Sequence, residues 1–348
     1  MSRQKDLRSS FIFRKFRKKK FTKFTKLAQF FDVKFRSWKI VMTQENHQNS
    51  SSDRLYSIKQ TETRGRAVFA SKRIPSGTTV YIASHPYITV IKEDFKKETC
   101  AWCFKYQYGN KCWVKHPDTS VGVWFCSVEC LQKWRKDDYD GKLTEALSCL
   151  RTTKARKQMA KMSNFPMDLT KLVVAAIVQR SRESDGTLPS NQPCWDNVLD
   201  LQAGVYDEGI DLPSEVSQLT AFLENNLPPT LRHLITSTAF PLLSRHLSNS
   251  FGIWELPITP DSENLGSAMY PSASYFNHSC NPNVAKVREG RIVRFVTSRD
   301  VEEDEELCIS YGHTERELEE RRQVLKEWWG FECDCSRCTR EQDENGEI

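Results

Sequence analysis

Three short segments near the C-terminus of this chain decide its fold: YFNHSCNPNV (275–284), EELCISYGH (305–313) and FECDCSRC (331–338). The first segment contains one cysteine and the last contains three, namely Cys280, Cys333, Cys335 and Cys338. Zinc prefers four sulfur ligands in a tetrahedron, and ligands that are distant in the chain hold their segments together. The spacing therefore predicts a zinc site that ties the last segment to the first.

A second cluster of cysteines lies nearer the N-terminus. CAWC and CSVEC supply two pairs with the spacing of zinc-finger ligands, namely Cys100, Cys103, Cys126 and Cys130. The chain has twelve cysteines, and no apolar, cleavable segment at its N-terminus marks it for secretion. Clustered cysteines in that setting favour zinc in a reducing compartment over a disulfide framework. We expect two zinc ions.

Length and hydropathy limit the class of protein. The 348 residues are enough for one large domain or two modest ones with a substantial core. Hydrophobic residues make up 39% of the chain, and no run of 18 or more apolar residues occurs. A membrane-spanning helix needs about 20 such residues, so we expect no membrane span.

The net charge of +6 comes from the N-terminal arm. Residues 1–41 contain 14 Lys and Arg against 2 Asp and Glu, whereas the remaining 307 residues contain 37 against 43. Binding to nucleic acid by counterion release needs clustered basic side chains on the folded surface. The acidic balance of the folded body therefore argues against direct, sequence-specific nucleic-acid binding.

The basic arm, residues 1–41, interleaves Phe with Lys and Arg. Four interpretations stay open: a nuclear-localisation or membrane-surface arm, an Arg-rich mitochondrial presequence, an extension that precedes a true start at Met42, or a disordered solvated arm. The polar run TQENHQNSSSD (43–53) precedes the folded body, so we expect a disordered tail over 1–53. We expect the protein in the nucleus, the cytoplasm or both, with the mitochondrion as the alternative.

Hydrophobic periodicity predicts strands at both ends of the folded body and helices between them. Short β-type runs occur within 54–91 and again within 250–312. Glu289 and Gly290 mark a hairpin turn in the second group. Between them, helical spacing is found at LTKLVVAAIVQR (169–180) and EVSQLTAFLENNL (215–227).

The C-terminal segment begins with a helix signal. Thr314 and Glu317 have the spacing of a capping box, which predicts a helix from Thr314 to Trp329 that stops at Gly330. That helix would carry Phe331 and the last three cysteines towards the site that Tyr311 faces.

Taken together, these segments resemble a SET-domain protein-lysine methyltransferase of the SET-and-MYND branch, of a fungal type with a reduced MYND finger. The resemblance covers roughly residues 54–340. It implies a mainly β SET fold, in which small sheets and a pseudoknot-like crossing are interrupted by a zinc finger and a helical insert. The expected parts are a split SET domain at 54–312, a MYND-like zinc finger at 100–134, a helical insert at 140–247, and a post-SET helix with a zinc-binding segment at 313–340.

The resemblance also implies roles for single residues. Tyr311 ends the motif ELxxxY and would be the catalytic tyrosine, and Phe251 of the segment NSF would line the channel for the lysine. The residues expected to bind S-adenosylmethionine are Asn249, Ser274, Asn277, His278 and Phe331, together with the N-terminal loop Gly65, Arg66 and Ala67. The family's loop is usually Gly-x-Gly, so Ala67 is a departure that leaves the backbone less free.

The finger departs from the family as well. A full MYND finger holds a second zinc ion through another CxxC before Cys126 and an HxxxC after Cys130. Here Cys112 is the one further cysteine between Cys103 and Cys126, and neither His nor Cys follows in LQKWRKDDYDGKL. We therefore predict one zinc ion in this finger, with Cys112 left over.

Methyl transfer to a lysine makes modest chemical demands. The amine must be neutral, whereas a free lysine has a pKa of about 10.4. A narrow desolvated channel that ends at a positive sulfonium lowers that pKa. In-line positioning then supplies roughly 7–11 kcal/mol. A tyrosine hydroxyl and backbone carbonyls suffice for orientation, and no carboxylate pair or metal-bound water is needed.

Two functions remain after these observations. The first is a S-adenosylmethionine-dependent protein-lysine N-methyltransferase, acting as a monomer on a histone tail or on another lysine-bearing protein. The second is a catalytically inactive module of the same architecture that binds a protein partner. The presence of Tyr311, Asn277 and His278 favours the first.

Overall fold

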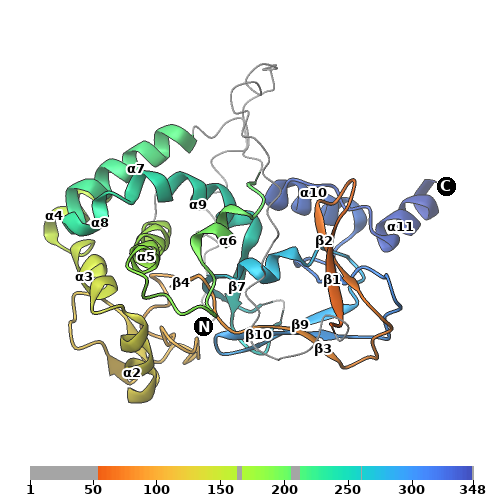
Figure 1. Ribbon diagram of the computed structural model, residues 1–348, viewed down its shortest axis with the longest axis horizontal. Coiled ribbons are helices and arrows are strands. Elements are labelled where there is room, and N and C mark those ends of the chain that lie inside the picture. Colours follow the sequence, from red (N-terminus) through yellow and green to blue (C-terminus); the bar gives the residue numbers. More distant parts are fainter. Residues whose placement is uncertain (1–53, 163–166, 205–211, 260, 347–348) are drawn as a thin grey trace, which may run out of the picture.

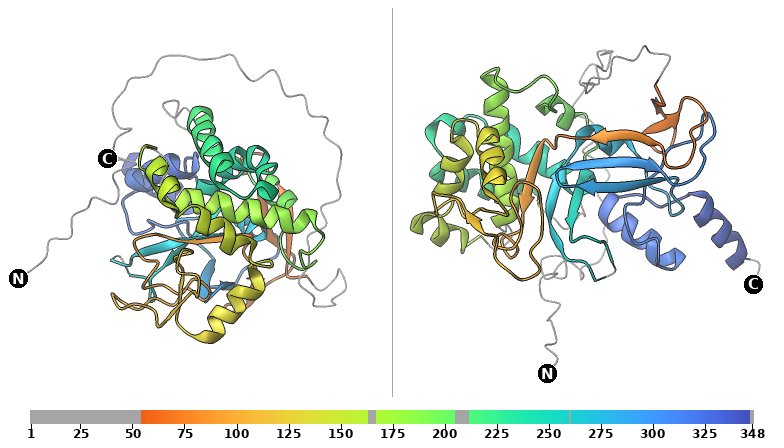
Figure 2. Two further views of the ribbon diagram at one scale, coloured as in Figure 1. Left: turned by 90° about the vertical axis from the view of Figure 1, so that its left-hand side faces the viewer. Right: turned by 90° about the horizontal axis from the view of Figure 1, so that it is seen from below.

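The computed structural model describes residues 54–162, 167–204, 212–259 and 261–346. The basic arm and the polar run at 43–53 lie outside these residues, so the interpretations of the arm stay predictions. Within the described residues, no helix is long and apolar enough to cross a membrane. Helices α2 to α5, α7 and α8 gather at one end of the molecule, and β1, β2, α10 and α11 lie at the other (Figures 1 and 2).

The strands form four small antiparallel sheets. Their members are β1 (Tyr56–Gln60) with β2 (Arg66–Ala70); β3 (Thr79–Ala83), β10 (Ile292–Thr297) and β9 (Val284–Glu289); β4 (Ile88–Ile91), β8 (Asn264–Met269) and β7 (Ser250–Trp254); and β5 (Val114–Lys115) with β6 (Trp124–Phe125). Strands β3 and β4, before residue 92, therefore pair with β10 and β8, after residue 249, and the finger and the helices interrupt one folded unit.

Alternation of side chains sets the faces of these strands. In β10 the buried residues are Val293, Phe295 and Thr297, so one face of its sheet forms the core. The hairpin from β9 to β10 turns at Gly290, whose φ of +64° is natural for glycine. The predicted turn is confirmed.

The helical region contains eight helices among the described residues. They are α2 (Val128–Asp137), α3 (Lys142–Cys149), α4 (Thr153–Met159), α5 (Met167–Ser184), α6 (Trp195–Leu199), α7 (Leu212–Asn226), α8 (Pro229–Arg232) and α9 (Ile235–Asn249). The two helices predicted from apolar spacing are confirmed as parts of α5 and α7.

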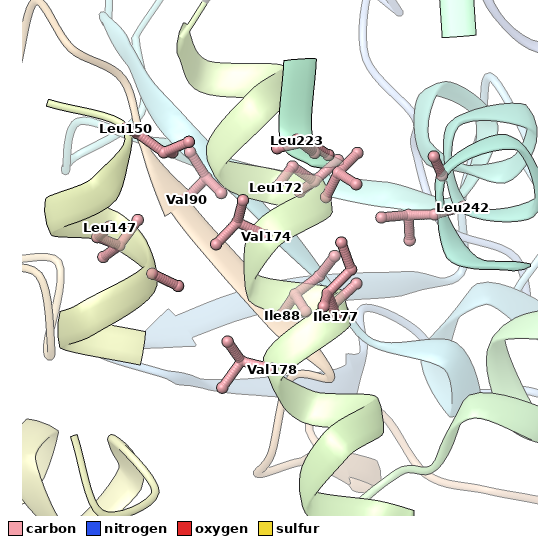
Figure 3. Close-up of a cluster of buried hydrophobic side chains, with 14 of the residues drawn as sticks. Ile88, Val90, Leu147, Leu150, Leu172, Val174, Ile177, Val178, Leu223 and Leu242 are labelled. Carbon is pink, nitrogen blue, oxygen red and sulfur yellow. The ribbon is translucent and has the colours of Figure 1, made fainter. Parts of the chain in front are cut away.

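Helix α5 is the centre of this region because it is buried on more than one face. Its Leu172, Val174, Ile177 and Val178 lie between side chains of other elements: Ile88 and Val90 of β4, Leu147 and Leu150 of the α3 segment, Leu223 of α7 and Leu242 of α9 (Figure 3). The same core therefore joins the helices to the sheet that contains β7 and β8.

The C-terminal helices flank the other end of the sheets. Helix α10 (Leu318–Trp329) ends at Gly330 with φ +77°, as predicted, and α11 (Ser336–Gly346) follows. The predicted start at Thr314 is wrong. Glu317 is the N-cap with an extended backbone (ψ 161°), and the preceding residues form a turn in which the Arg316 amide donates to the His313 carbonyl at 3.2 Å.

Candidate active site and zinc centres

Two chain segments cross at the centre of the candidate site. Ile309 donates its amide to the carbonyl of Asn277 at 2.9 Å, and Ser279 donates to the carbonyl of Ile309 at 2.9 Å. His278 and Ile309 thereby form an isolated parallel bridge. This contact places the NHSC segment directly beside the end of EELCISY, which is the crossing expected from the sequence.

Tyr311 is held at both ends by this crossing. Its amide donates to Nδ1 of His278 at 3.0 Å, and its hydroxyl donates to the carbonyl of Phe276 at 3.1 Å. Burial raises the pKa of Tyr311 above its usual value. The hydroxyl therefore stays protonated at neutral pH, where it can orient a neighbouring group but cannot act as a base.

His278 connects the tyrosine to the cysteines. Burial lowers its pKa to about 4, so the ring is neutral at physiological pH. Since Nδ1 accepts from Tyr311, the ring proton belongs on Nε2. That nitrogen lies 3.3 Å from Sγ of Cys280. The ring thus donates towards a cysteine of the C-terminal cluster.

Asn277 is fixed by Arg64 and Glu306, two residues that were not predicted from the sequence as site residues. Its Nδ2 donates to Oε1 of Glu306 at 2.9 Å, and Oε2 of Glu306 accepts from Arg64 at 2.7 Å. Arg64 also donates to the carbonyl of His278 at 2.8 Å. A signal for Glu306 was present, because it is the first residue of ELxxxY; nothing in the sequence pointed to Arg64.

The N-terminal loop reaches the same crossing. Nδ2 of Asn277 lies 3.4 Å from the carbonyl oxygens of Arg64 and of Arg66, which flank Gly65. Gly65 has φ +66°, the region that glycine favours, and a Cβ added there would meet only Oε1 of Gln202, at 3.9 Å. The loop therefore presents bare backbone next to Asn277.

Ala67 was expected to leave the loop backbone less free than glycine would, but its position does not require that freedom. It lies inside β2, opposite Lys59, fully buried and without a positive φ. A second glycine is thus not required by backbone conformation. The Arg66 guanidinium, by contrast, is occupied elsewhere: it lies 4.6 Å from the ring centroid of Tyr275 and bonds to the Asp200 carbonyl.

Asn249 and Ser274 contact each other and are linked to the N-terminal loop through Gln202. Oγ of Ser274 donates to the carbonyl of Asn249 at 3.2 Å. The Asn249 amide donates to the carbonyls of Gln202 at 2.9 Å and Arg245 at 2.8 Å. The structure therefore brings together these two predicted residues, and Gln202 connects them with Gly65.

Two aromatic rings from the C-terminal segment, those of Trp329 and Phe331, pack near Tyr311. The ring of Phe331 lies 6.2 Å from that of His278 and edge-on to that of Tyr311 at 6.3 Å. The ring of Trp329 is closer to Tyr311, at 5.3 Å, and its position was not predicted from the sequence. Its signal was the run WWGF at the end of α10, which places an aromatic two residues before Phe331.

Phe251 belongs to a second group of rings that leads to Tyr311. It lies edge-on to Phe295 at 6.3 Å, and Phe295 stacks on Phe276 at 4.6 Å with their planes 15° apart. The carbonyl of Phe276 accepts from the Tyr311 hydroxyl. Phe251, Phe295 and Phe276, called here the aromatic wall, therefore run from β7 to the predicted catalytic residue.

The four C-terminal cysteines come together as predicted. Cys280 Sγ lies 3.9 Å from Sγ of Cys333 and 3.5 Å from Sγ of Cys338, and all four sulfurs lie within 4.8 Å of one another, Cys335 included. Four sulfurs at ~2.3 Å from a tetrahedral zinc ion are about 3.8 Å apart. The cluster fits one such ion without rearrangement.

The finger cysteines form a second group with the same geometry. Cys103 and Cys126 are 3.5 Å apart and Cys126 and Cys130 are 3.6 Å apart at their sulfurs, with Cys100 completing the set. Cys112 is buried beside them but is not a member. Burial, together with the neighbouring thiolates, raises the pKa of Cys112 to about 12. In the described part of the chain these two groups are the ones with metal-ligand geometry.

A family model described as "SET domain" matches residues 65–312, which is most of the chain. The chain belongs to the SET-domain family. The predicted family is confirmed, and the crossing of residues 277–279 with 307–311 lies within the matched SET domain.

Several curated proteins are similar to this SET-domain chain. The Saccharomyces cerevisiae protein "Potential protein lysine methyltransferase SET6" is 28% identical over 82% of the chain and 95% of its own length. The Arabidopsis thaliana "Histone-lysine N-methyltransferase ASHR1" is 23% identical over 82% of the chain and 55% of its length. Mouse "Histone-lysine N-methyltransferase SMYD3" is 28% identical over 63% of the chain and 47% of its length.

Among solved structures, "Crystal structure of the SET domain of LSMT bound to Lysine and AdoHcy" aligns at a TM-score of 0.38 and 12% identity, over 82% of this chain and 54% of that one. A likeness this low adds nothing to the family assignment.

A cavity of about 120 Å³ lies apart from the SET-domain crossing, between the finger, β4 and α5. Its walls include Thr99, Trp134 and Arg291, and none of the predicted catalytic or cofactor-binding residues lines it. The predicted catalytic residue Tyr311 lies at the crossing and does not line this cavity.

Proposed function

We propose that this SET-domain chain is a S-adenosylmethionine-dependent protein-lysine N-methyltransferase. The observation that carries the proposal is the double anchoring of Tyr311, by His278 at its amide and by the Phe276 carbonyl at its hydroxyl. That arrangement aims a protonated hydroxyl at the end of the aromatic wall. Membership of the family and the lysine-methyltransferase names of the similar proteins support the same activity.

The residues around the crossing fit a cofactor of this kind. The backbone on either side of Gly65 lies beside the Asn277 amide, and Gln202 links Gly65 to the Asn249–Ser274 contact. The Phe331 ring lies beside His278, which follows Asn277. We infer that these residues bind S-adenosylmethionine, which supplies an electrophilic methyl group on a positive sulfonium. An adenine ring would find its stacking partner in Phe331.

The chain's own residues would then prepare the acceptor amine. Burial along the aromatic wall disfavours the charged ammonium, so the reactive neutral form becomes more populated. The hydroxyl of Tyr311 and the carbonyl of Phe276 orient the amine nitrogen towards the methyl group. Positioning of this kind supplies roughly 7–11 kcal/mol without a general base.

Zinc has a structural part in the proposal. We infer one ion at Cys280, Cys333, Cys335 and Cys338 and one at Cys100, Cys103, Cys126 and Cys130. The C-terminal ion would hold Phe331 against His278, because Cys333 is two residues from Phe331 and Cys280 is two residues from His278. The substrate is proposed to be a lysine of a histone tail or of another protein.

The deciding experiment is methyl transfer from labelled S-adenosylmethionine by the full chain purified with zinc. Recombinant histones and a whole-cell lysate serve as acceptors, and Tyr311→Phe is assayed in parallel. We expect labelled acceptors with the native chain and loss of label with Tyr311→Phe, while both proteins bind the cofactor equally in a calorimetric titration. Cofactor binding without transfer to any acceptor would instead identify an inactive interaction module.

A further inference from the structure

Strand β9 places a lysine where its sheet otherwise faces the core. Lys286 is directly opposite Phe295 in the β9–β10 ladder, and side chains of opposite residues share one face of a sheet. Phe295 is fully buried, and Val284, two residues before Lys286 and therefore on the same face, is buried as well. Lys286 therefore lies on the face of β9 that also carries buried residues, although its own side chain is accessible to water.

The amine of Lys286 lies on the aromatic wall. Its Nζ is 5.7 Å from the ring centroid of Phe251, the residue expected to line the lysine channel. Phe251 packs edge-on against Phe295, which stacks on Phe276, and the Phe276 carbonyl accepts from the Tyr311 hydroxyl. The chain's own amine thus stands beside the rings that an incoming lysine would pass.

No acidic group accompanies this amine. In residues 54–162, 167–204, 212–259 and 261–346, no ion pair or side-chain hydrogen bond is formed by Lys286. Lys59 makes the same kind of ring contact, 5.2 Å from the Phe69 centroid, but pairs with Asp304 at 2.6 Å. Lys59 is therefore neutralised by a carboxylate, whereas Lys286 contacts the Phe251 ring and places its charge near His278.

The surroundings of Lys286 favour its neutral form. Burial of the amine lowers the pKa of Lys286 to about 8, so roughly a tenth is free base at pH 7, against less than a thousandth at an ordinary pKa of about 10.4. The side chain as a whole remains accessible to water.

We propose that Lys286 is a methyl acceptor within its own chain, modified by the site that Tyr311 anchors. This inference rests on the proposed methyltransferase function. The neutral Nζ attacks the sulfonium methyl carbon, and the N–C bond forms as the S–C bond breaks. S-adenosylhomocysteine leaves as a neutral thioether, and the new secondary ammonium can lose its extra proton to solvent.

The test uses the full chain purified with zinc and incubated with labelled S-adenosylmethionine without any added acceptor. Peptide mass spectrometry locates the label. We expect a mass gain of one methyl group at Lys286, at a rate per chain that does not change with protein concentration. Label incorporated per chain should be at least tenfold lower in Lys286→Arg than in the native chain. The matched control Lys59→Arg should incorporate as much label as the native chain.

A mixing experiment separates reaction within one chain from reaction between chains. Tyr311→Phe retains Lys286 but lacks the catalytic hydroxyl, and Lys286→Arg retains the hydroxyl but lacks the acceptor. An equimolar mixture should leave Lys286 of the first variant unlabelled. Label at that position would overturn the proposal of reaction within one chain.

Histones and lysate are assayed in parallel. They distinguish failure of Lys286 methylation from failure of the proposed methyltransferase activity itself. Transfer to an added acceptor with an unmodified Lys286 in the native chain would overturn this inference and leave the proposed function intact. No transfer to any protein would overturn both. These two readouts use the native chain only, so they decide the matter even where a variant fails to fold.

Discussion

The amide of Tyr311 donates to Nδ1 of His278 at 3.0 Å, and this one contact joins two motifs that lie 33 residues apart. The opposite nitrogen of the same ring is 3.3 Å from Sγ of Cys280. His278 therefore spans from the predicted catalytic tyrosine to the C-terminal cysteine cluster. Loss of the imidazole ring should therefore affect both Tyr311 and the cysteine cluster.

His278→Ala tests that link. The variant leaves the Tyr311 amide without an acceptor and opens a hole in a buried site, which typically costs about 1–3 kcal/mol. We expect the free energy of unfolding to fall by about that amount and the affinity for S-adenosylmethionine to fall at least tenfold. Urea denaturation and calorimetric titration measure the two effects. His233→Ala, at an exposed position after α8, should change neither.

The two cysteine clusters should differ in what they support. Cys335→Ser and Cys126→Ser should each lower the zinc content of the purified chain from two ions to one, as measured by elemental analysis. Only Cys335→Ser should also weaken cofactor binding, because only the C-terminal cluster holds Phe331 beside His278. Equal loss of cofactor affinity in both variants would contradict the separate roles.

The sequence motifs predicted the central residues of the site better than the residues that hold them in place. Asn277, His278 and Tyr311 were identified because short motifs fix the spacing between groups that act together, and the structure brings them together. Arg64 and Glu306 were missed as partners because their contact joins positions 242 residues apart. No local pattern encodes such a pair, since it depends on how β1, β2 and the crossing pack.

Secondary structure was predicted best where one periodicity dominates. The apolar spacing of α5 is strong because that helix is buried on several sides, and its prediction is confirmed. The start of α10 was wrong because the Thr314-to-Glu317 spacing matches a capping box, while the turn at His313–Arg316 delays the helix to Leu318. Local signals specify which cap is possible, and tertiary packing selects the one that forms.

Ala67→Gly tests whether the departure from Gly-x-Gly matters. Ala67 is fully buried in β2 with no positive φ, so glycine there adds backbone freedom and removes a buried methyl group. We expect a loss of about 1 kcal/mol in the free energy of unfolding and no gain in cofactor affinity. A tenfold gain in affinity would show that the methyl group of Ala67 obstructs the cofactor.

Glu93 gives the protein a predictable response to acid. Burial alone would raise the pKa of Glu93, but Lys171, Lys96 and Arg151 outweigh it and lower the pKa to about 2. Oε1 of Glu93 lies 3.1 Å from Nζ of Lys171 and 2.5 Å from Nη2 of Arg151, so the carboxylate joins the end of β4 to α5 and to the segment after α3.

The sign of the effect follows from the two states. Since the pKa of Glu93 is lower in the folded chain than its usual value of about 4.3, the carboxylate stabilises the fold above that value, and the stabilisation is lost as pH falls towards 2. Glu93→Gln should therefore lower the free energy of unfolding by up to about 3 kcal/mol at pH 7, and the difference from the native chain should shrink between pH 4.5 and pH 2. Urea denaturation of both proteins at each pH measures this difference, in which any loss of zinc common to the two cancels.

Glu289→Gln is the matched control for Glu93. Glu289 also pairs with an arginine, Arg294 at 3.0 Å, but its side chain is 54% exposed to solvent. Exposed pairs contribute about 1 kcal/mol or less because water screens them, so this variant should follow the native pH profile closely. A Glu93→Gln profile parallel to that of Glu289→Gln would show that the three basic neighbours do not hold the Glu93 carboxylate in its charged form.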